Sequence, residues 1–323
     1  MVAAAYAFAH FAVDLACAFA VFSTGTEPWG FFLYNLFAFA MQMPLGLLAD
    51  IINKDKLFAC FGILLVGVCC LFPSRGTIYM CLLGLGNGLF HIGGGMEVMG
   101  RHPNLAGPLG AFVAPGALGI YLGTLLGKGG RSIFPVLTAL SASLVWILSV
   151  HRSPKQHSSG PVEIPDKNIL LPGALLFLVV VLRSVGSAVL LPWKEDTLAL
   201  VAVCAVVFGK MLGGILSDRL DARTVSITSL ALSAILFLFS GRPIPGLAAL
   251  LLFNMTMPIT LSALSKALPN TKGLAFGTLT FALFLGFLPS YFGMAPISAA
   301  VMAAICLLSA VLLVPALKAG ERL

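Results

Sequence analysis

Long apolar runs alternate with short polar connections along the whole chain. A helix that crosses a bilayer core about 30 Å thick needs about 20 apolar residues, because each residue rises about 1.5 Å. The runs are close to that length, so we predict an all-α membrane protein with twelve transmembrane helices. Divided at charges and at clusters of Pro, Gly and Asn, the segments are 3–23, 30–50, 57–73, 77–99, 107–127, 133–150, 168–191, 197–217, 224–240, 245–267, 273–292 and 294–317.

The longest polar connection lies between the sixth and seventh segments. Residues 151–167 are rich in Pro, Ser and charged residues, which favour turns and interact with water. We expect this stretch to be a cytoplasmic linker. It would join an N-terminal six-helix bundle, residues 1–150, to a C-terminal six-helix bundle, residues 168–323.

The composition excludes the soluble classes. Of the 323 residues 59% are apolar and 10% are charged, whereas soluble domains have roughly 45–50% and about 25%. The net charge is +7, but Lys and Arg are scattered singly between apolar runs, so we expect no nucleic-acid partner. All seven Cys lie within apolar runs, and none forms a C-x-x-C pair. We therefore expect no disulfide and no zinc site formed by these Cys.

The distribution of Lys and Arg predicts the orientation. With the N-terminus in the cytoplasm, twelve basic residues fall in inner loops and five in outer loops, and inner loops carry the basic excess in membrane proteins. We therefore expect a multi-pass protein of the plasma membrane with both termini in the cytoplasm. No basic leader precedes the first run, so we expect no cleavable signal.

A short motif occurs twice. Gly46-Leu-Leu-Ala-Asp50 closes the second segment, and Gly214-Ile-Leu-Ser-Asp218 closes the eighth. One copy is a common way for a helix to leave a membrane. Two copies at equivalent places indicate two six-helix pseudo-repeats, an architecture that transporters use to alternate access around a central site.

These motifs resemble the major facilitator superfamily, whose corresponding loops carry a G-x-L-[AS]-D-R-x-[GD]-R-[RK] pattern. The second copy continues with Arg219 and Arg223 and matches well, whereas the first copy has Ile51 where the pattern has Arg. The resemblance implies the major facilitator fold. It also implies that the motif residues hold one conformational state: Asp50, Asp218, Arg219 and Arg223.

A narrower resemblance is to the fosmidomycin-resistance branch of that superfamily, a group of drug efflux proteins. Its H-x-x-x-D pattern in helix 1 matches His10 and Asp14, and its G-x-G-x-x-x-F-H pattern in helix 4 matches the stretch that ends at His91. The branch continues with Pro-Glu after this His, whereas this chain continues with Ile-Gly. A degraded antiporter-like glycine pattern also occurs in the fifth segment.

Ionisable residues inside a membrane are functional candidates, because a charge at mid-bilayer costs about 2.5–3.5 kcal/mol. The i, i+4 spacing places His10 and Asp14 on one face of the first helix. Asp14 can then gain and lose a proton while His10 tunes its proton affinity. The alternative is a static pair that holds this helix to a neighbour.

Further along, His91 lies midway in the fourth segment, where a packing role and a cavity role both remain open. Glu97 lies nearer the cytoplasmic end and is spaced to pair with Arg101 one turn later. We therefore interpret Glu97 as a gate or structural residue.

The second half supplies the opposite charge. Arg183 and Lys210 lie too deep in their segments for snorkelling to an interface, so each should meet an acid, a carbonyl or an anionic substrate. We expect Asp14 or Glu97 to be their partner. Asn35 and Asn254 are candidates for hydrogen bonds to substrate, with interhelical contacts as the alternative.

The predicted function is a proton-coupled secondary active transporter. Efflux of a small organic or drug-like molecule follows from the resemblance, and proton-coupled uptake of a metabolite is the alternative. A membrane enzyme would need a nucleophile or metal motif, and neither H-E-x-x-H nor G-x-S-x-G occurs. We expect protons, a small-molecule substrate and the lipid bilayer as partners of a monomer that uses no cofactor and no metal.

Overall fold

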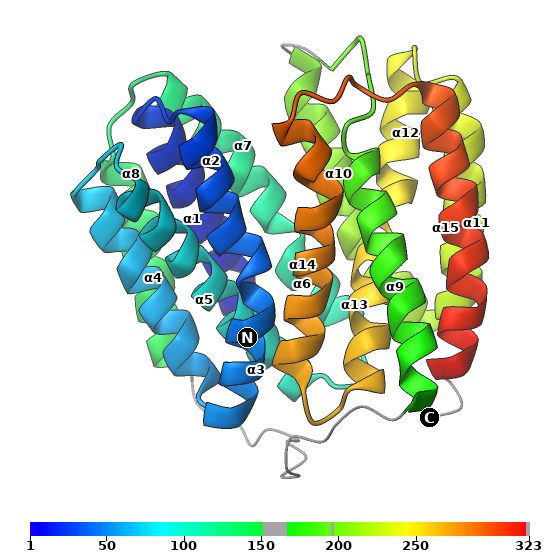
Figure 1. The fold of residues 1–323 in the computed structure, drawn as a ribbon, viewed down its shortest axis with the longest axis horizontal. Helices are drawn as coiled ribbons and strands as arrows, with labels where there is room; N and C mark the ends of the chain where they lie inside the picture. The colour runs from blue at the N-terminus through cyan, green and yellow to red at the C-terminus, as the bar shows by residue number, and fades with distance from the viewer. Residues whose placement is uncertain (151–166, 195–196, 321–323) are drawn as a thin grey trace. The chain divides into compact units, whose positions relative to one another are not determined.

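The computed structural model describes residues 1–150, 167–194 and 197–320, and the first half of the chain forms a run of helices (Figure 1). Most of the predicted linker, 151–166, lies outside the described residues. The helices of this half are α1 (Val2–Ser23), α2 (Pro28–Asn35), the π-helical turn η1 (Leu36–Ala40), α3 (Gln42–Ile52), α4 (Asp55–Leu71), α5 (Thr77–Arg101), α6 (Gly107–Val113), α7 (Pro115–Lys128) and α8 (Phe134–Ser149).

The second half is helical in the same way. Its described residues contain no β-strand, and their one isolated bridge pairs Val189 with Ile297. The helices are α9 (Lys167–Gly186), α10 (Thr197–Arg219), α11 (Ala222–Leu238), α12 (Pro243–Asn254), α13 (Thr256–Ala267), α14 (Lys272–Tyr291) and α15 (Ala299–Gly320).

When the helices are joined across short breaks, they reproduce the twelve predicted segments and confirm the all-α fold. Two boundaries differ from the prediction by five residues. The seventh helix ends at Gly186 instead of residue 191, and the last begins at Ala299 instead of residue 294. The cause is the bridge between Val189 and Ile297, because both flanking stretches use their backbone for this pairing rather than for a helix.

Three predicted helices are interrupted near their middles. Pro115 begins α7, and Pro258 lies just after the break that separates α12 from α13. A proline has no backbone N–H and crowds the carbonyl four residues earlier, which interrupts a helix. The third interruption is η1, where the Met41 N–H bonds to Leu36 O at 3.0 Å, five residues back.

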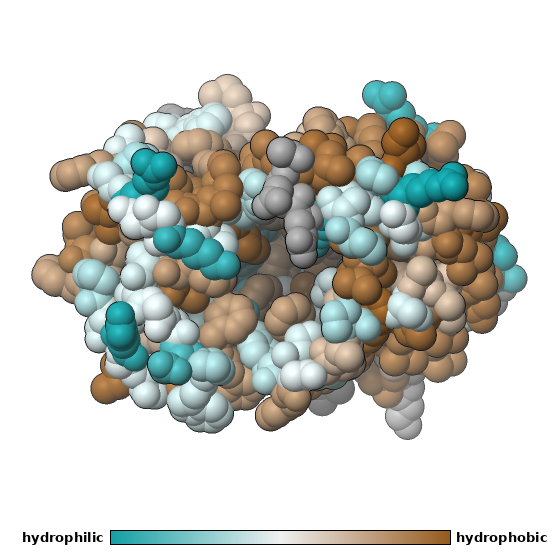
Figure 2. All heavy atoms as spheres, turned by 90° about the horizontal axis from the view of Figure 1, so that it is seen from above, coloured by the Kyte–Doolittle hydropathy of each residue, from teal (hydrophilic) through white to brown (hydrophobic). Residues whose placement is uncertain are grey.

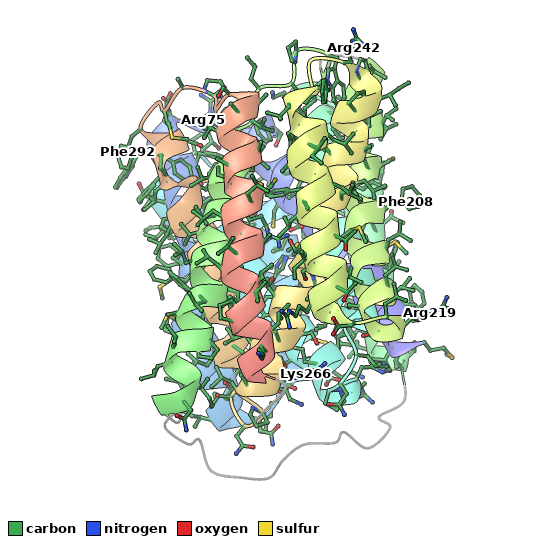
Figure 3. All side chains as sticks on the ribbon, turned by 90° about the vertical axis from the view of Figure 1, so that its right-hand side faces the viewer. Arg75, Phe208, Arg219, Arg242, Lys266 and Phe292 are labelled. Carbon is green, nitrogen blue, oxygen red and sulfur yellow. The ribbon has the colours of Figure 1, made fainter. Side chains whose placement is uncertain are left out.

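Eight of the described helices are long and apolar enough to cross a membrane, and α8 and α11 are shorter apolar helices. Many large apolar side chains are exposed, among them Phe208, which points outward from α10 in Figure 3. Figure 2 shows apolar side chains along the outer margins with hydrophilic ones scattered among them. Such a surface suits a lipid environment.

The chain divides into two compact units. The first comprises Met1–Pro103, Ala111–Val162 and Asn270–Phe281, and the second comprises the remaining residues. The units therefore follow the two sequence halves except for two exchanged segments. Residues Asn104–Gly110 of the first half belong to the second unit, and Asn270–Phe281 of the second half belong to the first.

In the first unit α1 is enclosed by α4, α5, α7 and α8 (Figure 1). The glycines of α7 make this possible: a Cβ at Gly119 would overlap Phe11 O, and a Cβ at Gly123 would overlap Leu15 O. The two backbones therefore lie in direct contact, as small residues allow in membrane helices. This packing buries the face of α1 that carries the predicted proton site.

In the second unit α11 packs against α12 and α15, and α9 packs against α13 and α15. Arg219 and Lys266 lie at one end of this unit, and Arg242 lies at the other (Figure 3). The distribution of Lys and Arg in the sequence likewise predicts Arg219 and Lys266 in inner loops and Arg242 in an outer loop. Which end is cytoplasmic remains a prediction.

Candidate functional site

The first unit brings His91 to the predicted pair of His10 and Asp14. His10 and Asp14 lie one turn apart on α1, and His91 reaches them from α5. His10 Nε2 is 2.9 Å from His91 Nε2 and 3.2 Å from Asp14 Oδ2, and His91 Nε2 is 3.7 Å from Asp14 Oδ1. The predicted pair is therefore a cluster of three residues.

Both imidazoles are oriented by backbone carbonyls. His10 Nδ1 lies 2.8 Å from Phe112 O, and His91 Nδ1 lies 2.9 Å from Asn87 O. A carbonyl oxygen can only accept a hydrogen bond, so each Nδ1 carries the proton and donates it. In a neutral ring the proton-free nitrogen is then Nε2.

The two Nε2 atoms therefore face each other as acceptors. Two lone pairs at 2.9 Å repel, and a hydrogen atom or a cation between them would remove this repulsion. If one ring holds a second proton, its Nε2 donates to the other ring, and the carboxylate of Asp14 balances the positive charge. A binding site for one positive ion at this cluster remains a prediction.

The cluster is shielded from solvent. His10 is 6% exposed, Asp14 7% and His91 7%. The Phe112 ring lies 4.8 Å from the His10 ring and the Phe90 ring lies 6.2 Å from it, centroid to centroid. Electrostatic interactions among these three side chains are therefore stronger than they would be in water.

Two residues that the sequence reasoning missed support the cluster. Asn87 donates from Nδ2 to Asp14 Oδ1 at 3.1 Å. Gly116 of α7 lies directly against the cluster, since a Cβ there would overlap Asp14 Oδ2 and His10 Nε2. One signal for Asn87 was available, because it precedes His91 by four residues on the same helix face.

Glu97 and Arg101 form an ion pair on α5. Glu97 Oε2 accepts from Arg101 Nε at 3.0 Å, and both side chains are largely buried. The i, i+4 pairing expected from the sequence is therefore present. A gate role for Glu97 remains a prediction.

Asp50, at the end of the first repeated motif, binds the backbone at the start of α14. Its Oδ1 accepts from the Gly273 N–H at 2.8 Å and its Oδ2 accepts from the Leu274 N–H at 2.8 Å. Gly46, one turn earlier, touches the backbone of Gly273 so closely that a Cβ would overlap it. Gly and Asp four residues apart thus let one helix end dock on another and satisfy two of its free N–H groups.

Asp218, at the end of the second motif, makes the equivalent contacts. Its two carboxylate oxygens accept from the Ala106 and Gly107 N–H groups, each at 2.7 Å. A Cβ at Gly214 would overlap Ala106 O. The sequence repeat therefore corresponds to a repeated structure, in which each carboxylate binds one of the two exchanged segments.

The basic residues of the motif take no part in these contacts. Within the described residues neither Arg219 nor Arg223 lies within ion-pair distance of Asp218, and Arg219 points outward at the end of α10 (Figure 3). Lys272, the residue before the Gly273 that Asp50 binds, donates from Nζ to the backbone oxygen of Met99 at 3.4 Å.

Arg183 is a buried cation of the second unit. Its Nη2 donates to Thr256 Oγ1 at 2.6 Å, and its guanidinium carbon lies 5.9 Å from the centre of the Phe253 ring. Its Nε and Nη1 have no hydrogen-bond partner among the described residues, and no described carboxylate forms an ion pair with it. Lys210 lies partly buried on α10. The expected partnership of these cations with Asp14 or Glu97 remains a prediction.

Asn35 and Asn254 occupy equivalent places in the two halves. Each is the last residue of a helix before an interruption, α2 before η1 and α12 before α13. Each donates from Nδ2 to the carbonyl four residues earlier, Phe31 O and Leu250 O, at 2.8 Å. A hydrogen bond from either residue to substrate remains a prediction.

No protein-family model matches the sequence, and no curated protein matches it. Several solved structures are similar to this chain in fold. The fucose:proton symporter FucP of E. coli is 12% identical with a TM-score of 0.64, and covers 96% of this chain and 97% of its own. A second structure of FucP, in the outward conformation, has a TM-score of 0.65 at 11% identity, with the same coverage.

A bacterial homologue of the iron transporter ferroportin, in an outward-facing state, matches over 100% of this chain and 99% of its own. The identity is 11% and the TM-score 0.63. Such likeness, at low identity over nearly the full length, establishes the fold. The chain is a multi-helix membrane protein with the major facilitator fold of secondary transporters.

Proposed function

We propose that this protein is a proton-coupled secondary active transporter that exports a small organic molecule by alternating access. The observation that carries the proposal is the buried cluster of His10, Asp14 and His91, in which two acceptor nitrogens face each other at 2.9 Å beside a carboxylate. A proton is the smallest ion that satisfies this arrangement. Export is supported by the resemblance to the fosmidomycin-resistance branch.

Proton binding would be coupled to helix packing. With the proton present, His10 and His91 share a hydrogen bond and Asp14 balances the charge, so α1 and α5 attract each other. When the proton leaves to water, the Nε2 lone pairs repel and the carboxylate lacks its counter-ion. Because a buried unpaired charge costs several kcal/mol, the deprotonated cluster favours a conformation in which water reaches it.

The paired caps would hold one conformational state. Asp50 and Asp218 each bind two backbone N–H groups of a segment that comes from the opposite sequence half. Hydrogen bonds to a charged group contribute about 1.5–3 kcal/mol each. Releasing both caps in the other state would therefore be an energetic step of the cycle.

The substrate would carry an anionic group. Arg183 is 8% exposed, and its Nε and Nη1 have no hydrogen-bond partner in the part of the chain that the structure describes. A buried cation of this kind is stabilised by an anion, and a guanidinium binds carboxylate or phosphate through two parallel hydrogen bonds. The second candidate function is proton-coupled uptake, which is favoured by the likeness in fold to a fucose:proton symporter.

Proton movement in proteoliposomes tests the proposal. A set of small organic anions is added outside vesicles that contain a pH-sensitive dye, and we expect at least one to drive proton flux through the wild-type protein. Antiport moves protons against the direction of the substrate, and symport moves them in the same direction. His91→Gln should abolish the flux, while His102→Gln, at the end of the same helix, should retain it. Equal flux in both variants would contradict the role of the cluster.

A further inference from the structure

We propose that His10, His91 and Asp14 also form a binding site for one divalent first-row transition-metal ion. The three ligand atoms, one from each residue, all lie within 4.8 Å of one another. This inference goes beyond the proposed transport function, because a metal ion at this place would exclude the shared proton.

The spacing of the ligand atoms fits a tetrahedral ion. Zinc bonds to His nitrogen at about 2.0–2.1 Å and to carboxylate oxygen at about 2.0–2.2 Å, so two ligand atoms on a tetrahedron are about 3.3 Å apart. The two nitrogens are 2.9 Å apart, and the Asp14 carboxylate lies 3.2 Å from His10 Nε2 through Oδ2 and 3.7 Å from His91 Nε2 through Oδ1. Both nitrogens and one oxygen of the carboxylate, all within 4.8 Å of one another, are therefore within reach of one ion of this size after small side-chain movements.

The ligand atoms also have the chemical state that a metal needs. Metal-binding His residues typically donate the other ring N–H to a carbonyl or carboxylate, which fixes the orientation of the ring. His10 does so to Phe112 O and His91 does so to Asn87 O. Both Nε2 lone pairs are thereby directed at the same place, and no change of tautomer is required.

The donor set limits which ions fit. Two imidazoles and one carboxylate suit zinc, cobalt, iron or copper, whereas calcium and magnesium prefer oxygen ligands only. Three protein ligands leave the fourth tetrahedral position open for water or for a group of a substrate. The Asp14 carboxylate neutralises one of the two charges of a divalent ion, and an anionic group in the open position would neutralise the other.

Asn87 gives an independent observation. Its Nδ2 binds Asp14, but its Oδ1 is buried and has no hydrogen-bond partner among the described residues. A buried acceptor without a partner is costly and calls for an explanation. A water molecule on the open position of the metal ion is a donor of the kind that this oxygen lacks.

Cobalt(II) is the probe that tests the site, because its visible absorption reports tetrahedral coordination. The full chain is purified in detergent, its affinity tag is removed so that no engineered His remains, and Co²⁺ is titrated. We expect one ion per chain with strong ligand-field absorption, displaced by Zn²⁺. His91→Gln and Asp14→Asn should each weaken binding at least about tenfold, while His102→Gln should bind as the wild type does.

Two results overturn the inference: absence of tetrahedral Co²⁺ absorption in the wild type, or equal absorption in His91→Gln. Size-exclusion profiles establish that each variant is folded. If one single variant is not folded, the double variant His10→Gln with His91→Gln repeats the comparison. Proton flux in vesicles is measured separately. Flux without metal binding refutes only the metal site, and metal binding without flux refutes only the proposed transport function.

Discussion

The Nε2 atoms of His10 and His91 lie 2.9 Å apart although both rings already use their Nδ1 protons on backbone carbonyls. Removing one of the two nitrogens removes the shared site. We predict that His91→Gln abolishes proton movement but changes the dissociation constant of the substrate by no more than about threefold. Equilibrium binding and vesicle proton flux measure the two effects. A large loss of substrate affinity with normal coupling would contradict this assignment.

Asp14 balances the positive charge of the cluster. Breaking a buried charge pair by removal of one partner costs about 3–5 kcal/mol, so we predict that Asp14→Asn lowers the thermal unfolding temperature strongly. The double variant Asp14→Asn with His91→Gln should recover part of this loss, because the unpaired charge is then absent. Strictly additive effects of the two substitutions would show that the residues do not interact.

Gly116 leaves the space that the cluster occupies. We predict that Gly116→Ala displaces His10 or Asp14 and reduces proton flux at least tenfold, because the added Cβ overlaps both side chains. Gly67→Ala is the matched control, since a Cβ at Gly67 meets nothing within 4 Å. That control should leave flux unchanged and should raise stability slightly, by up to about 1 kcal/mol, through helix propensity.

Asp218 and Asp50 act on conformation rather than on substrate. We predict that Asp218→Ala slows turnover severalfold while substrate affinity stays within about twofold, because its partners are the backbone N–H groups of Ala106 and Gly107. Asp50→Ala should cost more stability, since Asp50 is the less exposed of the two. Single-turnover and steady-state transport rates separate cycling from binding. A fall in affinity with normal turnover would overturn the assignment.

Asp221 caps the first turn of α11. The hydrogen bond from the Thr224 backbone N–H, 2.8 Å long, lowers the pKa of this exposed carboxyl. The stabilisation is therefore fully present above the ordinary pKa and is lost as the pH falls through the lowered one. We predict that Asp221→Ala costs about 0.5–1 kcal/mol at neutral pH and less in acid. Thermal unfolding across pH measures this, with Asp221→Asn as the cap-retaining control.

The sequence was sufficient to predict the helices and their number, because both depend on local chemistry. Apolar runs near the thickness of a bilayer predict spanning helices because the backbone must satisfy its own hydrogen bonds in lipid. The main errors lay where distant residues compete for the backbone, as at Val189 and Ile297, whose pairing shortens two helices. Pro44, Pro115 and Pro258 were visible in the sequence as residues that interrupt helices, but the π-helical form of the turn before Gln42 was not.

The sequence by itself determined the all-helical membrane fold, the duplicated Gly–Asp motif and the pairing of His10 with Asp14 on one helix face, because each depends on spacing within a few residues. Only the tertiary structure decided that His91 completes the cluster, since 77 residues separate it from Asp14 and packing alone brings α5 to α1. It also decided that Asp50 and Asp218 bind backbone N–H groups rather than Arg side chains. Such partners carry no signal in residue identity, because every residue except proline offers the same N–H.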